Sequence, residues 1–144
     1  MNPLEGIWRL VDSRAWDEHD RQLASPYGTN PIGHIAFVNG RMLAALCNGD
    51  ASATGNETRG YSSYGGPYSF DGETLVVDVD MASDLSRIGG RQIRGVRVIA
   101  DNRIVLLPPA RNYGNSPQRR ELLWERVWQP DTEGVRPLPE SADW

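Results

Sequence analysis

The segment Pro31-Ile-Gly-His-Ile-Ala-Phe-Val-Asn-Gly-Arg-Met-Leu-Ala-Ala-Leu-Cys47 indicates the fold class of this 144-residue chain. Asn39-Gly40 stands between two alternating apolar runs, which is a strong signal for a two-residue β-hairpin turn. Residues paired across such a hairpin share one face of the sheet. We expect the apolar face to point inward: Gly33, Ile35, Phe37, Met42, Ala44 and Leu46. His34 and Cys47 then lie on the outer face.

Further turn signals, Asp71-Gly72 and Asp101-Asn102, recur along the chain, and no stretch shows a convincing helical period. The closely spaced strands between the turns predict an all-β fold, either an up-and-down antiparallel barrel or a sandwich. A ninth strand around residues 15–23 is left open. The eight expected strands span residues 6–13, 32–38, 41–47, 60–70, 73–81, 91–100, 104–107 and 120–128.

Composition narrows the classes of function. The net charge is −4, so we expect no nucleic-acid partner. All 15 basic residues are arginine, which excludes mechanisms with a lysine nucleophile. The single cysteine forms no intrachain disulfide, and two histidines cannot build a His-rich metal site, so we expect neither a metal nor a cofactor. No apolar run is long enough for a membrane span, and the first residues do not resemble a signal peptide, so we expect a cytoplasmic protein without a membrane partner.

Alternation predicts which side chains enter the interior from the other strands. In the first strand Trp8 and Leu10 form the natural inward pair, which also directs Asp12 inward. A turn at Asp71-Gly72 places one apolar face inside and leaves Asp78 and Asp80 on a solvated face. That inward face holds Tyr64, Gly66, Tyr68, Leu75, Val77, Val79 and Met81. In the strand over residues 91–100 the pattern alone does not choose a face.

Several motifs together resemble the bacterial and fungal lipocalin-like domain family. Glu5-Gly6-Ile7-Trp8-Arg9-Leu10-Val11 is similar to the family's opening Gly-x-Trp-[Arg/Lys]-Leu-Val. Others follow in the family's order: Pro26-Tyr27-Gly28, Pro31-Ile32-Gly33-His34-Ile35-Ala36-Phe37, Gly40-Arg41-Met42, Tyr64-Gly65-Gly66-Pro67-Tyr68, Gln92-Ile93-Arg94 and Leu123-Trp124-Glu125-Arg126-Val127. The resemblance covers residues 4–128, and the chain departs from the family at Asp12, usually a serine, and at Val77, often a histidine.

The resemblance implies an antiparallel barrel of about eight to ten strands over residues 1–128. The segment 129–144 carries Pro130, Pro137 and Pro139, so we expect it to be an extended tail. The resemblance further implies an internal cavity for a small, mostly apolar molecule, with Gln92 and Arg94 on the cavity side. It also implies that Trp8 stacks against Arg126 and closes one end of the barrel.

The expected inward polar side chains suggest a catalytic reading of the cavity, to which there are alternatives. Arg94 needs a partner in an apolar interior, either Asp12 or an oxygen group of a ligand. In the catalytic reading Arg94 and Gln92 bind a carbonyl or enolate oxygen while Asp12 or Tyr64 moves a proton, in a cofactor-independent isomerisation, cyclisation or elimination. We expect eight ligand contacts: Tyr27, Ile35, Phe37, Met42, Tyr68, Val77, Gln92 and Trp124.

Three alternatives to this chemistry remain. The polar side chains could form a structural Asp12–Arg94 ion pair, or the barrel could be a non-catalytic carrier. The protein could instead form a homodimer through the outer face around Leu43 and the segment 128–144.

Overall fold

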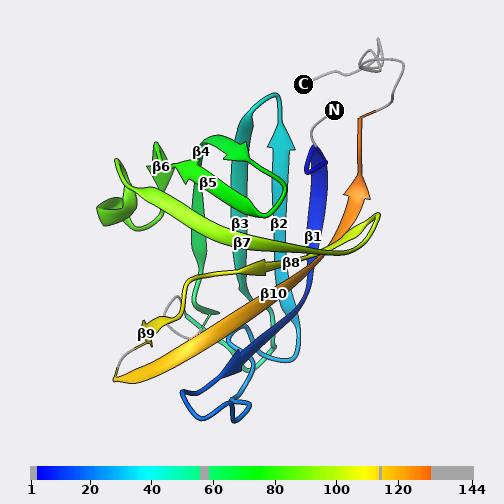
Figure 1. The fold of residues 1–144 in the computed structure, drawn as a ribbon. Coiled ribbons are helices and arrows are strands. Elements are labelled where there is room, and N and C mark those ends of the chain that lie inside the picture. The colour runs from blue at the N-terminus through cyan, green and yellow to red at the C-terminus, as the bar shows by residue number, and fades with distance from the viewer. Residues whose placement is uncertain (1–2, 56–58, 114, 131–144) are drawn as a thin grey trace.

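Eight antiparallel strands close into a barrel in the computed structural model, which describes residues 3–55, 59–113 and 115–130 (Figure 1). The strands follow one another around the barrel in chain order, and β1 pairs with β10 to close the ring. This confirms the predicted all-β barrel. Residues 131–144, most of the expected tail, lie outside the described part of the chain.

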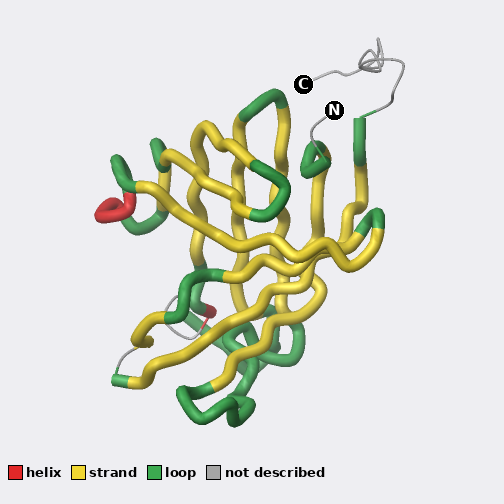
Figure 2. Tube along the Cα trace, in the orientation of Figure 1, coloured by secondary structure: helices red, strands yellow, loops and turns green. Residues whose placement is uncertain are grey.

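Strand makes up most of the trace, as Figure 2 shows. No helix among the described residues is long and apolar enough to cross a membrane. The ring strands are β1 (Gly6–Trp16), β2 (Pro31–Val38), β3 (Arg41–Asn48), β4 (Ser62–Phe70), β5 (Thr74–Asp78), β7 (Arg91–Ala100), β8 (Arg103–Leu107) and β10 (Ser116–Trp128). Outside the ring, β6 (Met81–Ala82) pairs with β4 and β9 (Arg111–Tyr113) pairs with β10, while η1 (Leu85–Arg87) is a short 3-10 helix. The strand left open around residues 15–23 is reduced to one bridge between Trp16 and Gln22.

The β2–β3 hairpin has the predicted register. Val38 pairs with Arg41, and Phe37 pairs with Met42. Asn39 and Gly40 both have positive φ, 50° and 79°, as the tight two-residue turn requires. The turn dipeptide therefore fixes which side chains of both strands enter the barrel.

The β4–β5 hairpin confirms the predicted faces, except at Met81. Phe70 pairs with Leu75, so the connection is two residues longer than predicted and the alternation is preserved. Beyond Asp78 the pairing shifts by one residue: Tyr68 faces Val77, but Gly65 faces Met81. That odd shift turns Met81 outward, where it is 41% exposed, and the inward position passes to Ala82.

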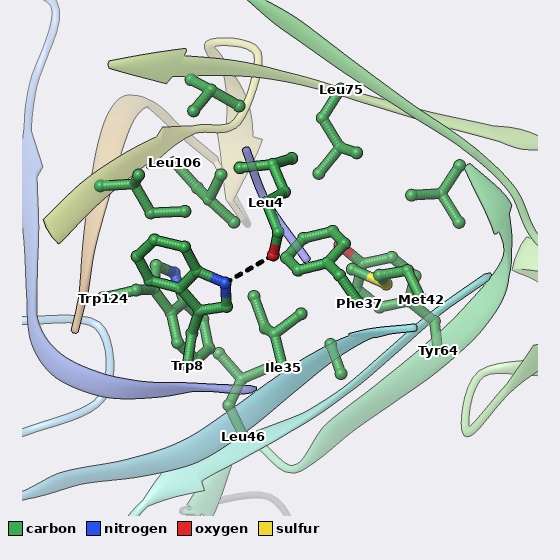
Figure 3. Close-up of a cluster of buried hydrophobic side chains, with 14 of the residues drawn as sticks. Leu4, Trp8, Ile35, Phe37, Met42, Leu46, Tyr64, Leu75, Leu106 and Trp124 are labelled. Atoms are coloured by element: carbon green, nitrogen blue, oxygen red, sulfur yellow. Dashed lines mark hydrogen bonds between the residues drawn. The ribbon is translucent and has the colours of Figure 1, made fainter. Parts of the chain in front are cut away.

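One end of the barrel is filled with apolar side chains (Figure 3). Trp8 is fully buried and its indole N–H donates to the Leu4 carbonyl at 2.9 Å. The Phe37 and Tyr68 rings meet edge to face, with centroids 5.0 Å apart. Residues that share the inner face thus form a solid core at this end, which we call the closed end.

Arg126 covers Trp8 at the closed end, as expected. Its Cζ lies 4.4 Å from the Trp8 ring centroid. The guanidinium also donates to the Pro3 carbonyl and, at 2.8 Å, to Gln129 Oε1. Arg126 therefore links the residues before β1 and the residues after β10 to Trp8.

Replacing Arg126 by methionine keeps much of the aliphatic stem but removes the cation and its hydrogen bonds. We expect Arg126→Met to lower the free energy of unfolding by about 1–2 kcal/mol, measured by urea denaturation. Arg103→Met, at an exposed position on β8, is the matched control and should change it little. Equal losses in the two variants would contradict a specific role for Arg126.

Candidate functional site

The other end of the barrel contains a cavity of about 450 Å³. Inward residues of β10 trace the interior from this cavity to the closed end, in the order Arg120, Leu122, Trp124 and Arg126. The apolar part of the cavity lining consists of Ile35, Ala44, Leu46, Leu106, Leu122 and Trp124. The cavity is therefore continuous with the packed core on one side and polar on the others.

The structure brings six of the expected site residues together in the cavity lining: Tyr27, Ile35, Tyr64, Gln92, Arg94 and Trp124. Four other expected ligand contacts are inward but lie outside this lining: Phe37, Met42, Tyr68 and Val77. Phe37 and Val77 are fully buried in the apolar core, and Met42 is 3% exposed. For these four residues alternation assigns the face correctly, but it does not give the position along the barrel axis.

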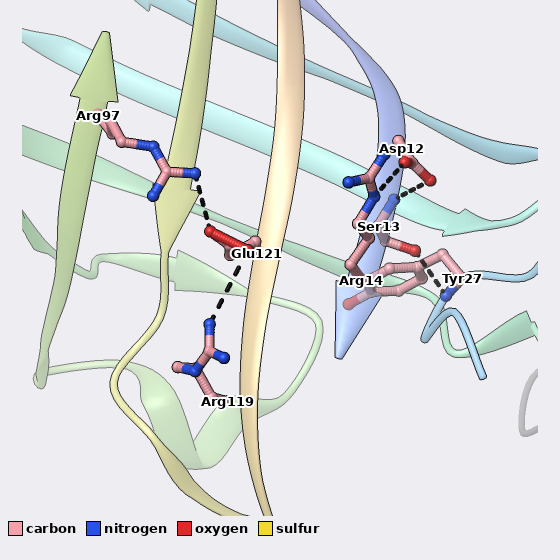
Figure 4. Close-up of polar contacts among 7 residues, drawn as sticks. All are labelled: Asp12, Ser13, Arg14, Tyr27, Arg97, Arg119 and Glu121. Carbon is pink, nitrogen blue, oxygen red and sulfur yellow. Dashed lines mark hydrogen bonds and ion pairs between the residues drawn. The ribbon is translucent and has the colours of Figure 1, made fainter. Parts of the chain in front are cut away.

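The predicted inward direction of Asp12 is wrong. A register shift in the β1–β10 ladder follows Leu10, because Leu10 pairs with Trp124 whereas Asp12 pairs with Leu123. This bulge directs Ser13, which is fully buried, inward in place of Asp12. Asp12 instead forms an ion pair with Arg14 at 2.9 Å, along the outer wall (Figure 4). A structural Asp12–Arg94 pair is thereby excluded.

Ser13 has a role that the sequence did not suggest. Its hydroxyl oxygen accepts a hydrogen bond from the Tyr27 backbone N–H at 3.1 Å (Figure 4). This contact holds the loop that follows β1 against the barrel, so that Tyr27 lines the cavity. Burial raises the pKa of Tyr27, which therefore stays protonated near neutral pH.

Arg94 and Tyr64 form the centre of the polar wall. Arg94 extends from the inner face of β7 and lines the cavity together with Tyr64, on whose hydroxyl its charge acts. Burial lowers the pKa of Arg94, and the nearby charges of Arg87 and Arg111 act in the same direction. Burial likewise raises the pKa of Tyr64, which leaves a neutral phenol beside a guanidinium.

Arg87 is a cavity residue that sequence reasoning missed. Its guanidinium donates to Gln92 Oε1 at 2.7 Å and to Ser62 Oγ at 3.1 Å, and its Cζ lies 4.2 Å from the Tyr64 ring centroid. It belongs to η1, whose first turn is capped by the Asp84 side chain. Because Arg87 occupies the Gln92 amide oxygen, the Gln92 NH₂ group is the part available to a ligand.

A second arginine pair lies at β9 and β10. Arg120 Cζ is 3.4 Å from the Tyr113 ring centroid, and Arg111 Cζ is 4.7 Å from the same ring. Gln118 Oε1 accepts two bonds from Arg120 at 3.3 Å. The inward spacing of Leu122 and Trp124 extends to Arg120, so the sequence held a signal for this residue. No comparable signal pointed to Arg111, which lies in the short strand β9.

The cavity lining is strongly positive. It contains four arginines, Arg87, Arg94, Arg111 and Arg120, and one carboxylate, Asp84, so the formal balance is 4 − 1 = +3. None of the four guanidiniums lies within ion-pair distance of a carboxylate among the described residues, and the Asp84 carboxylate accepts from Ser86 Oγ at 2.7 Å. Arg94 and Arg120 are partly removed from water while Arg111 is exposed, and such cations without a carboxylate within ion-pair distance are suited to binding an anion.

The described residues offer no candidate metal centre. In that part of the chain, no three His, Cys, Asp or Glu side chains come together as metal ligands. His34 lies on the outer wall of β2, as predicted, and His19 lies 3.6 Å from an oxygen of Glu18 in an exposed turn.

Comparisons with known proteins identify a family for the chain. The sequence matches the lipocalin-like domain family over residues 5–127. No curated protein matches it. Among solved structures, an uncharacterized protein from Bacteroides eggerthii superposes with a TM-score of 0.44 and 12% identity, over 85% of this chain and 98% of that one. A de novo designed fluorescence-activating β-barrel gives 0.42 and 10%, over 85% and 93%.

The buried tyrosines predict a loss of stability at high pH. The pKa of Tyr68 is raised to about 12 by burial and by Glu5, and the pKa values of Tyr27 and Tyr64 are raised in the same direction. In the unfolded chain these phenols ionise near pH 10. Their contribution to stability is therefore complete below about pH 10 and is lost as pH rises toward 12.

Urea midpoints measured at intervals above about pH 9 should fall with pH in the wild-type protein. In Tyr68→Phe they should fall less steeply, because one suppressed ionisation is gone. Tyr61→Phe, at a residue 54% exposed, is the control and should follow the wild-type slope. A wild-type midpoint that does not change over this range would contradict the account.

Proposed function

The chain belongs to the lipocalin-like domain family, and we propose that it binds a small organic molecule carrying an anionic oxygen group in the cavity. A barrel of this kind is consistent with small-molecule binding. The sequence suggested a largely apolar ligand with an oxygen function. The excess of cavity arginines adds the negative charge of that function to the proposal.

The observation that carries this proposal is the partly buried Arg94, which has no carboxylate within ion-pair distance among the described residues. A guanidinium removed from water is costly unless its donors and its charge are compensated. Within the barrel Arg94 has a phenol and its own neighbouring backbone, since Nη1 donates to the Ile93 carbonyl at 3.0 Å. A carboxylate, enolate or similar oxyanion would supply the missing charge and would match the planar donor geometry of arginine.

The rest of the cavity suits the body of such a molecule. Ile35, Leu46 and Trp124 offer an apolar surface opposite the arginines. The volume of about 450 Å³ lies within the range typical of small-molecule sites. The ligand we propose therefore has one charged end on Arg94 and an apolar portion against Trp124.

A second candidate function is catalysis by proton transfer on the bound molecule. It is favoured by one juxtaposition, Arg94 beside the protonated Tyr64 in the cavity lining. Two donors converging on one enolate oxygen would stabilise the charge that forms there when a water molecule in the cavity takes a proton from the adjacent carbon, as isomerisation, cyclisation or elimination requires. Tyr64 takes the acid role, because Asp12 lies on the outer wall. If no reaction accompanies binding, the protein acts as a carrier.

Two fluorescent probes of similar shape test the binding proposal: anionic anilinonaphthalene sulfonate and neutral phenylnaphthylamine. We expect Arg94→Gln to weaken binding of the sulfonate about 10- to 100-fold, the usual worth of a hydrogen bond to a charged group, and to change binding of the amine little. Fluorescence titration measures both dissociation constants.

Arg97→Gln is the matched control, because Arg97 lies on the outer face of the same strand and pairs with Glu121 at 2.8 Å. It should leave both probes unaffected. If both variants weaken the sulfonate equally, or if neither does, the cavity is not the anion site and the proposal fails.

A further inference from the structure

We infer that the natural ligand carries two anionic groups separated by an apolar body, one bound at each of two arginine pairs in the cavity. This inference rests on the proposed function and makes the ligand class more specific. We call Arg87 of η1 and Arg94 of β7 the β7 pair. We call Arg111 of β9 and Arg120 of β10 the β10 pair. All four side chains line the same cavity.

The two pairs are built in similar ways but on separate elements. In each pair, one tyrosine ring holds a guanidinium by stacking: Tyr64 holds Arg87 and Tyr113 holds Arg120. In each pair, a glutamine oxygen also accepts from the stacked arginine, Gln92 for Arg87 and Gln118 for Arg120. Neutral partners orient these cations, and the one carboxylate of the lining, Asp84, interacts electrostatically with Arg87 but is outnumbered by the four arginines. Each pair is thus a preformed position for one anion.

The pairs are close enough for one small molecule to reach both. All four guanidiniums line one cavity of about 450 Å³, and Tyr27 in the same lining is within electrostatic range of Arg120, Arg87 and Arg94. The charge of Arg111 also acts on Arg94 directly. The like charges therefore repel one another across the cavity. A monoanion would relieve this repulsion at one pair only, whereas a dianion would relieve it at both.

The apolar lining determines what connects the two charges. Leu122 and Trp124 follow Arg120 along the inner face of β10, while Ile35 and Leu46 line the cavity from β2 and β3. An aromatic or alicyclic body fits these side chains, and a flexible polar chain does not. A ring-bearing dicarboxylate, or a ring with one carboxylate and one enolate, has the required chemistry.

Two probes with the same ring system test the inference: naphthalenedicarboxylate with one carboxylate on each ring, and naphthalenecarboxylate. Calorimetric titration of the wild-type protein should show the dicarboxylate binding about tenfold more tightly or better, since a second charge-assisted contact is added. Arg120→Gln should remove this preference and leave the affinity for the monocarboxylate unchanged. Arg120→Lys, which keeps the charge, should retain part of the preference.

Arg119→Gln is the matched control, because Arg119 is the neighbouring residue and stacks on Trp16 outside the cavity at 4.4 Å. It should bind both probes as the wild type does. Circular dichroism spectra should confirm that all variants fold alike.

The outcomes distinguish the inference from the proposal beneath it. If the wild type binds both probes equally and Arg94→Gln weakens both, the anion site stands and the two-anion inference is overturned. If Arg120→Gln weakens both probes to the same extent, the β10 pair only shapes the cavity, which also overturns it. If neither probe binds, or Arg94→Gln changes neither affinity, the proposed function itself fails.

Discussion

The ladder between β1 and β10 is the constraint on which the rest of the structure depends. It gives β1 a partner on both edges, so the ring of strands has no free edge and the inner faces of all ring strands enclose one interior. At one end Trp8 and its apolar neighbours fill that interior, and Arg126 covers them. The remaining space must lie toward the other end, where the cavity is found.

In the described part of the chain, no carboxylate lies within ion-pair distance of the arginines that line that cavity, although Asp84 in the lining acts on Arg87 electrostatically. Tyr64 and Tyr113 orient guanidiniums through their ring faces, and Gln92 and Gln118 do so through their amide oxygens. Such contacts fix the direction of a cation but do not neutralise it. On the outer wall the chain uses carboxylates for the same purpose, as Arg14 with Asp12 and Arg97 with Glu121 show. The contrast between the two walls is the physical basis for assigning an anionic ligand to the interior.

The sequence predicted the parts of the fold that depend on local rules. Asn39-Gly40 fixed the β2–β3 register, because few other dipeptides tolerate two positive φ angles. The family resemblance correctly placed Gln92 and Arg94 on the inner face and Arg126 over Trp8.

The differences between the expected and the observed positions of side chains have three physical origins. Asp12 and Met81 each follow an odd register shift, and a shift of one residue reverses every later side chain in the strand. Such bulges arise from pairing with a distant strand, so the local alternation does not reveal them. Phe37 and Val77 illustrate a second limit, since period two gives the face but not the depth. Arg87 escaped notice because it lies in a short helix between strands.

The most direct test observes the cavity arginines themselves during anion binding. In protein labelled with nitrogen-15 at arginine, the Nε–Hε resonances of Arg94 and Arg87 report their hydrogen bonding. We expect naphthalenecarboxylate to shift these resonances saturably while those of Arg14 and Arg97, on the outer wall, stay in place. Small, unsaturable shifts shared by cavity and surface arginines would contradict the proposed anion site.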